Sequence, residues 1–509
     1  MMIESALAPL FPAWAVRRLQ SRLMFQTLRQ SYDAAKQGRR TRGWRTASTS
    51  ANAETRDALP TMRDRSRDMV RNNPYAAAGL DVLVAYQIGM GITPFSTTGT
   101  ADLDRQTDAL WMDWTKAADR TATLDLYGLQ SLAARTRSEA GEVLIQLSPL
   151  SDAEWRRSGS PIPLAISLLE PDYIDSSRTE TLAGGGWIQQ GIEFDAQGRR
   201  AAYWLHQRHP GDDFALVQLR GFGSTRYPAT NILHLLRVER PGQQRGVPDL
   251  APVMTRLRML DDYEDAALEQ ARVQACLAAF VTSGQAFQKG PLEGGTTDAE
   301  SGQRRRTLAP GLIERLLPGE DVKFNTVPAP GGVSEFARHQ LRAVAAGHGT
   351  TYDLLTGDLT QANYSSLRAG RLAFKRRLQH DQWMMLVPMM CEPIYDRFIA
   401  AAQSVGRLPM REGRWPRSWV PPRFDLLDPG AEYTAVRNAV RSGFMLQSEA
   451  IAEFGGDPRE FFDLKQADDE KLDARGIILD SDPRRITQAG LAQDAAQNAR
   501  VEIAANGAA

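Results

Sequence analysis

Along the chain, long segments with apolar residues at helical spacing alternate with short continuous apolar runs. Residues 61–94 predict two helices, because Asn73 and Pro74 interrupt the pattern and proline suits the first position of a new helix. The apolar stripe of the second helix has helical spacing and consists of Leu80, Val84 and Ile88. Glycines at positions 89 and 91 then predict the end of this helix.

Between residues 141 and 240 the pattern changes to β-branched and aromatic runs broken by Gly, Pro and Asp. These runs are GEVLIQL, LAISLLEPDYID, GIEFDAQGRRAAYWLHQ and TNILHLLRV. Within the third run, DAQGR at residues 195–199 predicts a hairpin turn between two strands. We therefore expect a mainly β domain here, and an α+β fold class for the chain.

A long helix is predicted over residues 247–281. Its apolar positions recur at helical spacing and are Leu250, Met254, Leu257, Leu260, Leu268, Ala271 and Leu277. At 1.5 Å per residue this helix would span roughly 50 Å, which is long for a globular domain. We expect Leu257, Leu260 and Leu268 to pack against further copies of the chain.

Glycine and proline break the pattern over residues 282–333 and predict a small β module with an exposed loop. A shorter helix is expected at residues 334–348, with Ser334 as its N-cap and Gly347 and Gly349 at its end. Farther along, Pro388 and Pro393 are expected to kink or interrupt a long helix.

The stretch LTGDLTQANYSSLRAGRLAFKRRL joins a short polar segment to a basic helix. We expect residues 351–364 to form a mobile loop, because Gly357 and short polar residues permit movement. Ser365 or Ser366 is expected to cap the helix. On that helix Leu367, Phe374 and Leu378 share an apolar face, and a basic face carries Arg368, Arg371 and Lys375.

Composition is that of a globular protein with more than one core. The chain has 509 residues, so about two to four domains or layers are expected. Apolar residues make up 42% and charged residues 24% of it. Cys276 and Cys391 cannot form a disulfide framework, and we expect both to be buried thiols.

The net charge is zero but unevenly spread. Residues 1–73 hold fourteen Lys and Arg against six Asp and Glu, and residues 449–482 hold four against eleven. Either the two ends contact different partners, or both are ordinary solvated surface. Residues 1–60 are expected to form a mobile basic arm. Its first residues lack the order of a signal peptide, and no run reaches a membrane span, so we expect a soluble protein of the cytoplasm.

No stretch of the sequence forms a specific catalytic motif. The glycine cluster GFGSTR at residues 221–226 lacks the spacing and the lysine of a phosphate-binding loop. His206 and His209 have no Cys or carboxylate at zinc-ligand spacing, and His339 and His348 fall on opposite helix faces. The carboxylates of DDYED, residues 261–265, are read as a solvated helix face rather than a metal or acid–base site. We expect no catalytic residue, no metal and no cofactor.

Taken together, several segments resemble the portal proteins of lambda-type tailed bacteriophages. They are RDRSRDMVRNNPYAAAGLDVLVAYQIGMGITP, SEAGEVLIQL, LEPDYID, GIEFDAQGRRAAYWL, PATNILHLLRVERPGQQRGVPDLAPVMTRLRMLDDYEDA, LPGEDVKF and GTTYDLLTGDLTQANYSSLRAGRLAF. The resemblance covers roughly residues 60–440 in a consistent order. It implies a non-enzymatic ring, usually of twelve copies, at one capsid vertex, through which double-stranded DNA is packaged and ejected.

The resemblance also implies a portal fold, with a mixed α/β wing, long stem helices, a small β-containing clip and a helical crown. By position, the wing would be residues 61–246, the stem helices 247–281 and 334–348, and the clip 282–333. A tunnel loop would occupy 349–364, a long kinked helix returning to the wing 365–430, and the crown with a flexible tail 431–509.

Site residues follow from the same resemblance. The tunnel loop would present Thr356, Asp358, Thr360, Gln361, Asn363 and Tyr364 to DNA, and the clip residues Arg304, Arg305 and Arg306 would help to dock the terminase. For the basic face of Arg368, Arg371 and Lys375 we favour contact with acids of the next subunit over proximity to DNA phosphate; an ordinary solvated face is the third reading.

The implied partners are further copies of the chain, in a ring of twelve, and double-stranded DNA. They also include the terminase large subunit, head–tail connector or adaptor proteins, and major capsid and scaffolding proteins. No membrane is implied, and the location would be the virion, with the host cytoplasm during assembly. Two alternatives stay open: another phage structural protein, such as a head–tail adaptor or minor head protein, or a metal-dependent nuclease that uses the acids at 261–265.

Overall fold

The computed structural model describes most of the chain. The described residues are 17, 39, 42–43, 46–212, 223–276, 279–282, 296–297, 304–305, 313–316, 333–360, 363–422, 424, 428–454, 456 and 458–479. The chain divides into two compact units, Met1–Glu54 and Thr55–Ala509. The elements that follow belong to the second unit, except that the first helix begins just before the boundary.

The first two described helices are α3 (Ala51–Asn72) and α4 (Pro74–Ile88). The Asn73 side chain caps α4 by accepting a hydrogen bond from the backbone N–H of Ala76 at 2.8 Å. Gly89 ends it with a φ of +50°, where a Cβ would lie 2.6 Å from the Pro422 side chain. The predicted restart and end of this helix are confirmed. The predicted arm was too long, because residues 51–60 are helical.

A three-stranded antiparallel sheet forms the centre of the second unit, in the order β3-β2-β9. Its strands are β2 (Glu142–Pro149), β3 (Leu164–Leu169) and β9 (Ile232–Leu236). Helices α5 (Ala101–Thr115), α6 (Leu126–Ala140) and α13 (Glu392–Ser404) share one apolar core with it. Within that core the rings of Trp111, Trp114, Tyr395 and Phe398 lie 5.0–5.8 Å apart, a spacing typical of packed aromatic pairs.

A second, five-stranded sheet runs in the order β4-β5-β6-β7-β8. Its strands are β4 (Glu180–Thr181), β5 (Trp187–Gln189), β6 (Ile192–Phe194), β7 (Arg200–His206) and β8 (Ser224–Pro228). The turn between β6 and β7 is the predicted hairpin, in which Asp195 accepts hydrogen bonds from the backbone N–H groups of Gln197 and Arg199. The expected β character of residues 141–240 is thus confirmed; α7 (Asp152–Ser158) and the short helices η2 (Pro171–Tyr173) and η3 (Ala229–Asn231) interrupt it.

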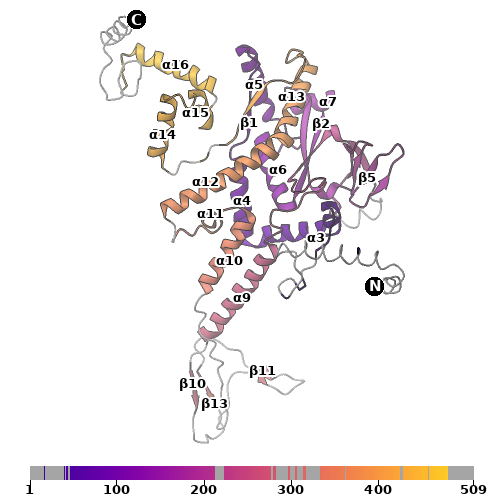
Figure 1. The fold of residues 1–509 in the computed structure, drawn as a ribbon, viewed down its shortest axis with the longest axis vertical. Helices are drawn as coiled ribbons and strands as arrows, with labels where there is room; N and C mark the ends of the chain where they lie inside the picture. The colour runs from indigo at the N-terminus through magenta and orange to yellow at the C-terminus, as the bar shows by residue number, and fades with distance from the viewer. Residues whose placement is uncertain are drawn as a thin grey trace. The chain divides into compact units, whose positions relative to one another are not determined.

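Two helices, α9 (Met254–Cys276) and α10 (Val333–His348), pack side by side (Figure 1). The predicted helix 247–281 was too long at both ends. Residues 249–253 form turns, since Pro248 and Pro252 cannot supply the backbone donors of a continuing helix, and β10 (Ala279–Thr282) follows it. The 23 residues of α9 span about 35 Å. Because α10 begins at Val333, Ser334 lies inside the helix and is not its N-cap.

The described residues after α9 form short β-strands. β10 pairs in parallel with β13 (Ile313–Leu316), and β11 (Thr296–Thr297) pairs antiparallel with β12 (Arg304–Arg305). These pairs agree with the predicted β module. The loop between them falls outside the described residues.

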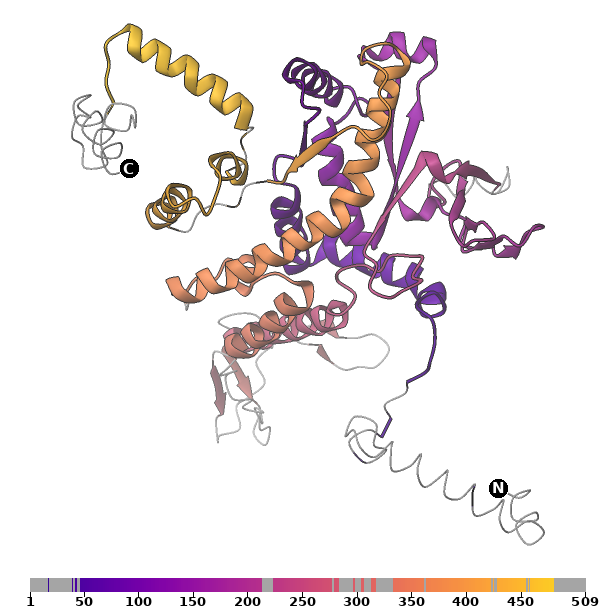
Figure 2. The same ribbon diagram turned by 45° about the horizontal axis from the view of Figure 1, so that its top comes forward.

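The chain then forms α11 (Tyr352–Thr356), α12 (Tyr364–Asp381), the π-helical segment η4 (Gln382–Cys391) and α13. The last three run on as one long helical path (Figure 2). The predicted interruption is confirmed, because the wider π-helical turns hold Pro388, and Pro393 lies in the first turn of α13. After it, β14 (Arg417–Val420) pairs antiparallel with β1 (Thr93–Ser96).

Three helices end the described chain: α14 (Pro429–Arg441), α15 (Gln447–Glu453) and α16 (Pro458–Ala474). The expected helical character of this region is therefore confirmed over these ranges. In the described part of the chain, no helix combines the length and apolar character needed to cross a bilayer.

Candidate functional site

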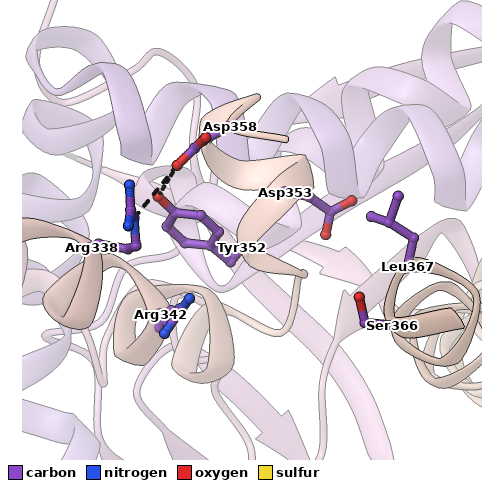
Figure 3. Close-up of a pocket in the computed structure, with 7 residues that line it drawn as sticks. All are labelled: Arg338, Arg342, Tyr352, Asp353, Asp358, Ser366 and Leu367. Carbon is purple, nitrogen blue, oxygen red and sulfur yellow. Dashed lines mark hydrogen bonds and ion pairs between the residues drawn. The ribbon is translucent and has the colours of Figure 1, made fainter. Parts of the chain in front are cut away.

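Asp358 organises the segment that joins α11 to α12 (Figure 3). Its Oδ1 accepts hydrogen bonds from the hydroxyl and the backbone N–H of Thr360, at 2.6 and 3.0 Å. Its Oδ2 accepts one from the Tyr352 hydroxyl at 2.8 Å, and Arg338 of α10 lies 3.7 Å away. The bonds from Thr360 and Tyr352, with the Arg338 charge, lower the pKa of Asp358 to about 2. The carboxylate is therefore ionised at neutral pH and fastens the segment to α10 and α11.

The first part of the predicted mobile loop is helical. Residues 352–356 form α11, because Leu355 is buried and the Thr356 hydroxyl bonds the Tyr352 carbonyl at 2.8 Å. Gly357, with a φ of +70°, then ends the helix, as its left-handed backbone suits glycine. The loop proper is thus shorter than predicted, and Thr356, Asp358 and Thr360 bond within their own chain. Gln361 lies outside the described residues.

The cap of α12 differs from the predicted one. Asn363, and not Ser365 or Ser366, is the N-cap, and its side chain accepts from the backbone N–H of Ser366 at 2.8 Å. Ser366 returns the bond, because its hydroxyl accepts from the Asn363 N–H at 3.3 Å. This reciprocal pair fixes where the loop ends. Tyr364, the first helical residue, is about half exposed.

The two faces of α12 separate as predicted, but the basic face meets its own chain. Phe374 and Leu378 are buried with Leu83 of α4. Arg371 donates to the Tyr86 hydroxyl at 2.9 Å and to Asp353 at 3.3 Å. The acid that was expected on a neighbouring subunit is therefore, for Arg371, one of the same chain. Arg368 is exposed, and the Lys375 ammonium lies 5.5 Å from the Phe424 ring centre.

A pocket opens beside this loop, between α10, α11 and the start of α12 (Figure 3). Its lining residues are Arg338, Arg342, Tyr352, Asp353, Asp358, Ser366 and Leu367. Two guanidinium groups and two carboxylates give it a mixed charge. The pocket can therefore both donate and accept hydrogen bonds. It does not present the concentrated charge of a cation-binding or phosphate-binding site.

One group of acidic and histidine side chains has the spacing of metal ligands. Within the described ranges, the ligand atoms of Glu170, Asp172 and His209 lie close enough to hold an ion. Arg67 already forms ion pairs with both acids, so a metal would have to displace its guanidinium. Of the acids at 261–265, Asp261 instead accepts from the Asn73 side chain at 2.7 Å, and burial with the charges of Asp261 and Asp265 raises the pKa of Glu264. Among the described residues, the acids at 261–265 do not form a group whose ligand atoms lie close enough to hold an ion.

A buried ionic network anchors the segment that precedes α9, and the sequence reasoning missed it. Glu142, at the start of β2, is fully buried and accepts from Arg63 of α3, from Arg245 and from His234 of β9, at 2.8–3.2 Å. It also accepts from the backbone N–H of Gly246 at 2.7 Å. Burial raises the pKa of this carboxyl, but Arg245, His234 and Arg63 outweigh that effect and lower it. The signal was an acid opening an apolar strand, in SEAGEVLIQL.

Leu257 and Leu260 do not face a neighbour. Both are buried in their own chain, with Leu80 of α4 and with Leu341 and Val344 of α10. Only Leu268, which is 51% exposed, is left of the three residues expected to pack against another copy. The predicted apolar stripe is confirmed as a helical pattern. Its first half, with Leu257 and Leu260, packs in the core of its own chain.

Other residues named from the sequence lie on β12, at the end of η4 and at the end of α10. Arg304 and Arg305 lie on β12, and Arg306 falls outside the described residues. Cys391 is buried as expected, and burial raises the pKa of its thiol; the side chain of Cys276 is not described. His348 is buried in α10, and desolvation lowers its pKa to about 4, so it is neutral at physiological pH.

Comparison with known proteins identifies the class of protein as a phage portal protein. Residues 37–382 match the family described as "Phage portal protein, lambda family", which is more than half of the chain. The chain therefore belongs to the lambda family of phage portal proteins.

Curated relatives bear the same name. The "Probable portal protein" of Halomonas phage phiHAP-1 is 24% identical over 468 residues, which cover 89% of this chain and 88% of the relative. The "Portal protein" of Escherichia phage N15 is 23% identical over 492 residues, 86% of this chain and 89% of the relative. "Portal protein B" of Escherichia phage lambda is 23% identical over 478 residues, 84% and 86% of the two chains.

Similar solved structures come from gene transfer agent particles. A chain of the virion of the native particle aligns with a TM-score of 0.36 and 15% identity, over 84% of this chain and 99% of its own. A chain of the neck of the native particle, computed with C12 symmetry, aligns with a TM-score of 0.38 and 15% identity, over 77% and 93%.

Proposed function

We propose that the chain assembles into a closed ring of about twelve copies at one vertex of a phage capsid, by a repeated head-to-tail contact. Double-stranded DNA passes through its channel during packaging and ejection. The observation that carries this proposal is the match of residues 37–382 to the lambda family of portal proteins. The ring acts in the virion, after assembly in the host cytoplasm.

The surfaces of α9 and α10 support ring assembly. Met259 is 71% exposed, Leu268 51% and Phe336 of α10 45%, so both helices keep large apolar side chains that their own chain does not cover. A head-to-tail contact in a ring would bury them against the next copy, and removing apolar surface from water favours that association.

The loop between α11 and α12 is proposed to face the DNA. Residues 356–366 contain no lysine or arginine, and Thr360, Asn363 and Tyr364 are exposed. A strongly basic lining would neutralise phosphates, release counterions and so hold the DNA in place. Neutral side chains with one internally bonded acid, Asp358, permit the duplex to slide.

The parts of the chain take the roles that the family resemblance implied. Residues 61–246 form the wing, α9 and α10 the stem, the β pairs after α9 the clip, and α14–α16 the crown. The clip, with Arg304 and Arg305, docks the terminase large subunit. Head–tail connector proteins then replace the terminase, and the major capsid and scaffolding proteins surround the wing.

Single-particle images of the purified full chain test the proposal. We expect rings with an axial hole and a constant number of subunits. A protein that stays monomeric at micromolar concentration would refute the proposal. A protein that binds only to rings formed by a different chain would favour the head–tail adaptor alternative.

A further inference from the structure

A groove of mixed apolar and basic character lies between α12 and α14. The residues that give it this character are Tyr86, Arg368, Leu372, Lys375, Phe424 and Val436. Arg368, Leu372 and Lys375 follow one another at i, i+4 and i+7 and so share one face of α12. Leu372 is 56% exposed there. Arg371 also lines the groove but is paired with Asp353, so the remaining charges of the lining are those of Arg368, Lys375 and the acidic Glu432.

The last described helix, α16, carries the opposite combination. Phe461, Leu464 and Asp468 lie at i, i+3 and i+7 on one face, with Phe461 44% and Leu464 59% exposed. Along the helix there are six acidic residues, Glu460, Asp463, Asp468, Asp469, Glu470 and Asp473, against three basic ones, Arg459, Lys465 and Lys471. An acidic helix with an exposed apolar stripe is complementary to a basic groove with an apolar floor.

Both of these surfaces belong to one chain. α16 packs on α15, and none of the described residues that line the groove comes from α16. Two complementary patches at different places on one molecule define a heterologous interface, which joins each copy to the next. The chain itself therefore supplies both halves of such a contact.

We propose that the groove between α12 and α14 binds helix α16 of a second copy of this chain. Phe461 and Leu464 cover Leu372 and the Phe424 ring, and Asp468 approaches the cations of α12. The apolar burial supplies most of the affinity, whereas the charges set the orientation of the helix. The inference rests on the ring proposed above and names one of the contacts that close it.

Chemical cross-linking of two different single-cysteine chains tests the contact. One chain carries Leu372→Cys and the other Leu464→Cys; both carry Cys276→Ser, and Cys391 is buried and stays. The two chains are co-expressed, assembled and treated with a short bis-maleimide. We expect a covalent two-chain species in the mixture and none with either chain alone. As a matched control, Met90→Cys, 94% exposed and outside the groove, should give no such species with Leu464→Cys.

Two outcomes would overturn the proposal. One is the absence of the two-chain species in the mixture. The other comes from a variant that carries both Leu372→Cys and Leu464→Cys: a cross-link formed only within that single chain would place α16 in its own groove. If imaging shows rings but the cross-link is absent, the groove contact fails while the ring stands. If the cross-link forms but images show no rings, the proposed function fails while the contact stands.

A charge exchange provides a second measurement. Arg368→Glu and Asp468→Lys, each alone, should reduce the yield of the two-chain species, because each places like charges together. The pair combined should restore it. Equal yields in all three variants would contradict the proposed orientation of α16 in the groove.

Discussion

Asp358 connects three pieces of chain that surround it. Through Tyr352, Thr360 and Arg338 it holds the loop to α11 and α10. Arg371 acts in the same way on the other side, since it bonds Asp353 and Tyr86. Asp358 and Arg371 were expected to face a partner, but both form hydrogen bonds within their own chain that hold the loop in place. We propose that the exposed residues between these two fixed points are the ones that touch DNA.

Protonation of Asp358 should release the loop, but only at strongly acidic pH. A carboxyl whose folded pKa is lowered contributes stability above its unfolded value, near pH 4, and loses it as the pH falls through the folded value of about 2. At pH 4 we expect pepsin to cut beside the exposed Leu359 faster in Asp358→Asn than in the natural chain. At pH 2 the two rates should converge.

The control for this comparison is Asp152→Asn, at an exposed position in α7 remote from the loop. It should be cut at the same rate as the natural chain at every pH. If Asp358→Asn and the natural chain are cut equally at pH 4, Asp358 does not hold the loop.

At the scale of elements, the sequence predicted those whose ends carry a local signal. Asn73 with Pro74, the Asp195 turn and Pro388 each act through their own backbone or side chain, so a single sequence reveals them. α11 could not be predicted in this way. A five-residue helix is too short to be stable alone, and it persists because Leu355 is buried and Asp358 bonds Tyr352. Such contacts join residues by tertiary packing, which apolar spacing does not display.

The apolar stripe of α9 shows the same limit of prediction from sequence. The spacing of its residues reveals a helical face, but it does not reveal what covers that face. Leu257 and Leu268 have the same spacing pattern, yet one is buried in its own chain and the other is half exposed. The Glu142 network was missed for a related reason, since its partners Arg63, His234 and Arg245 are distant in sequence.

Aspartate substitutions at these two leucines should therefore separate folding from assembly. Leu257→Asp places a charge in an apolar cluster and should lower the free energy of unfolding by about 3 kcal/mol or more. Leu268→Asp should leave the fold intact, within about 0.5 kcal/mol, and reduce ring formation. Urea denaturation measures the first effect and single-particle images the second. Rings of normal size and yield from Leu268→Asp would show that this part of α9 lies outside the subunit contact.

At the scale of the whole molecule, a ring multiplies each feature of one chain by the number of copies. In the proposed ring of about twelve copies, a substitution in the loop would appear about a dozen times around the channel, so a small change in charge would become a large one for the DNA. In the proposed ring, the same repetition would bring together the α12–α14 groove of one copy and α16 of another. The proposed function would therefore depend on positions whose effect within one copy is slight.

Thr360→Lys should show this multiplication directly. The residue is exposed in the loop, so one added lysine per chain would place about a dozen positive charges along the DNA path. We expect rings to form normally, DNA packaging to slow, and the loss of packaging to diminish as salt is raised, because counterions compete for the phosphates. Gln197→Lys, at an exposed hairpin position, adds the same charge elsewhere and should package at the natural rate. If both variants package alike at low salt, the loop between α11 and α12 does not line the channel.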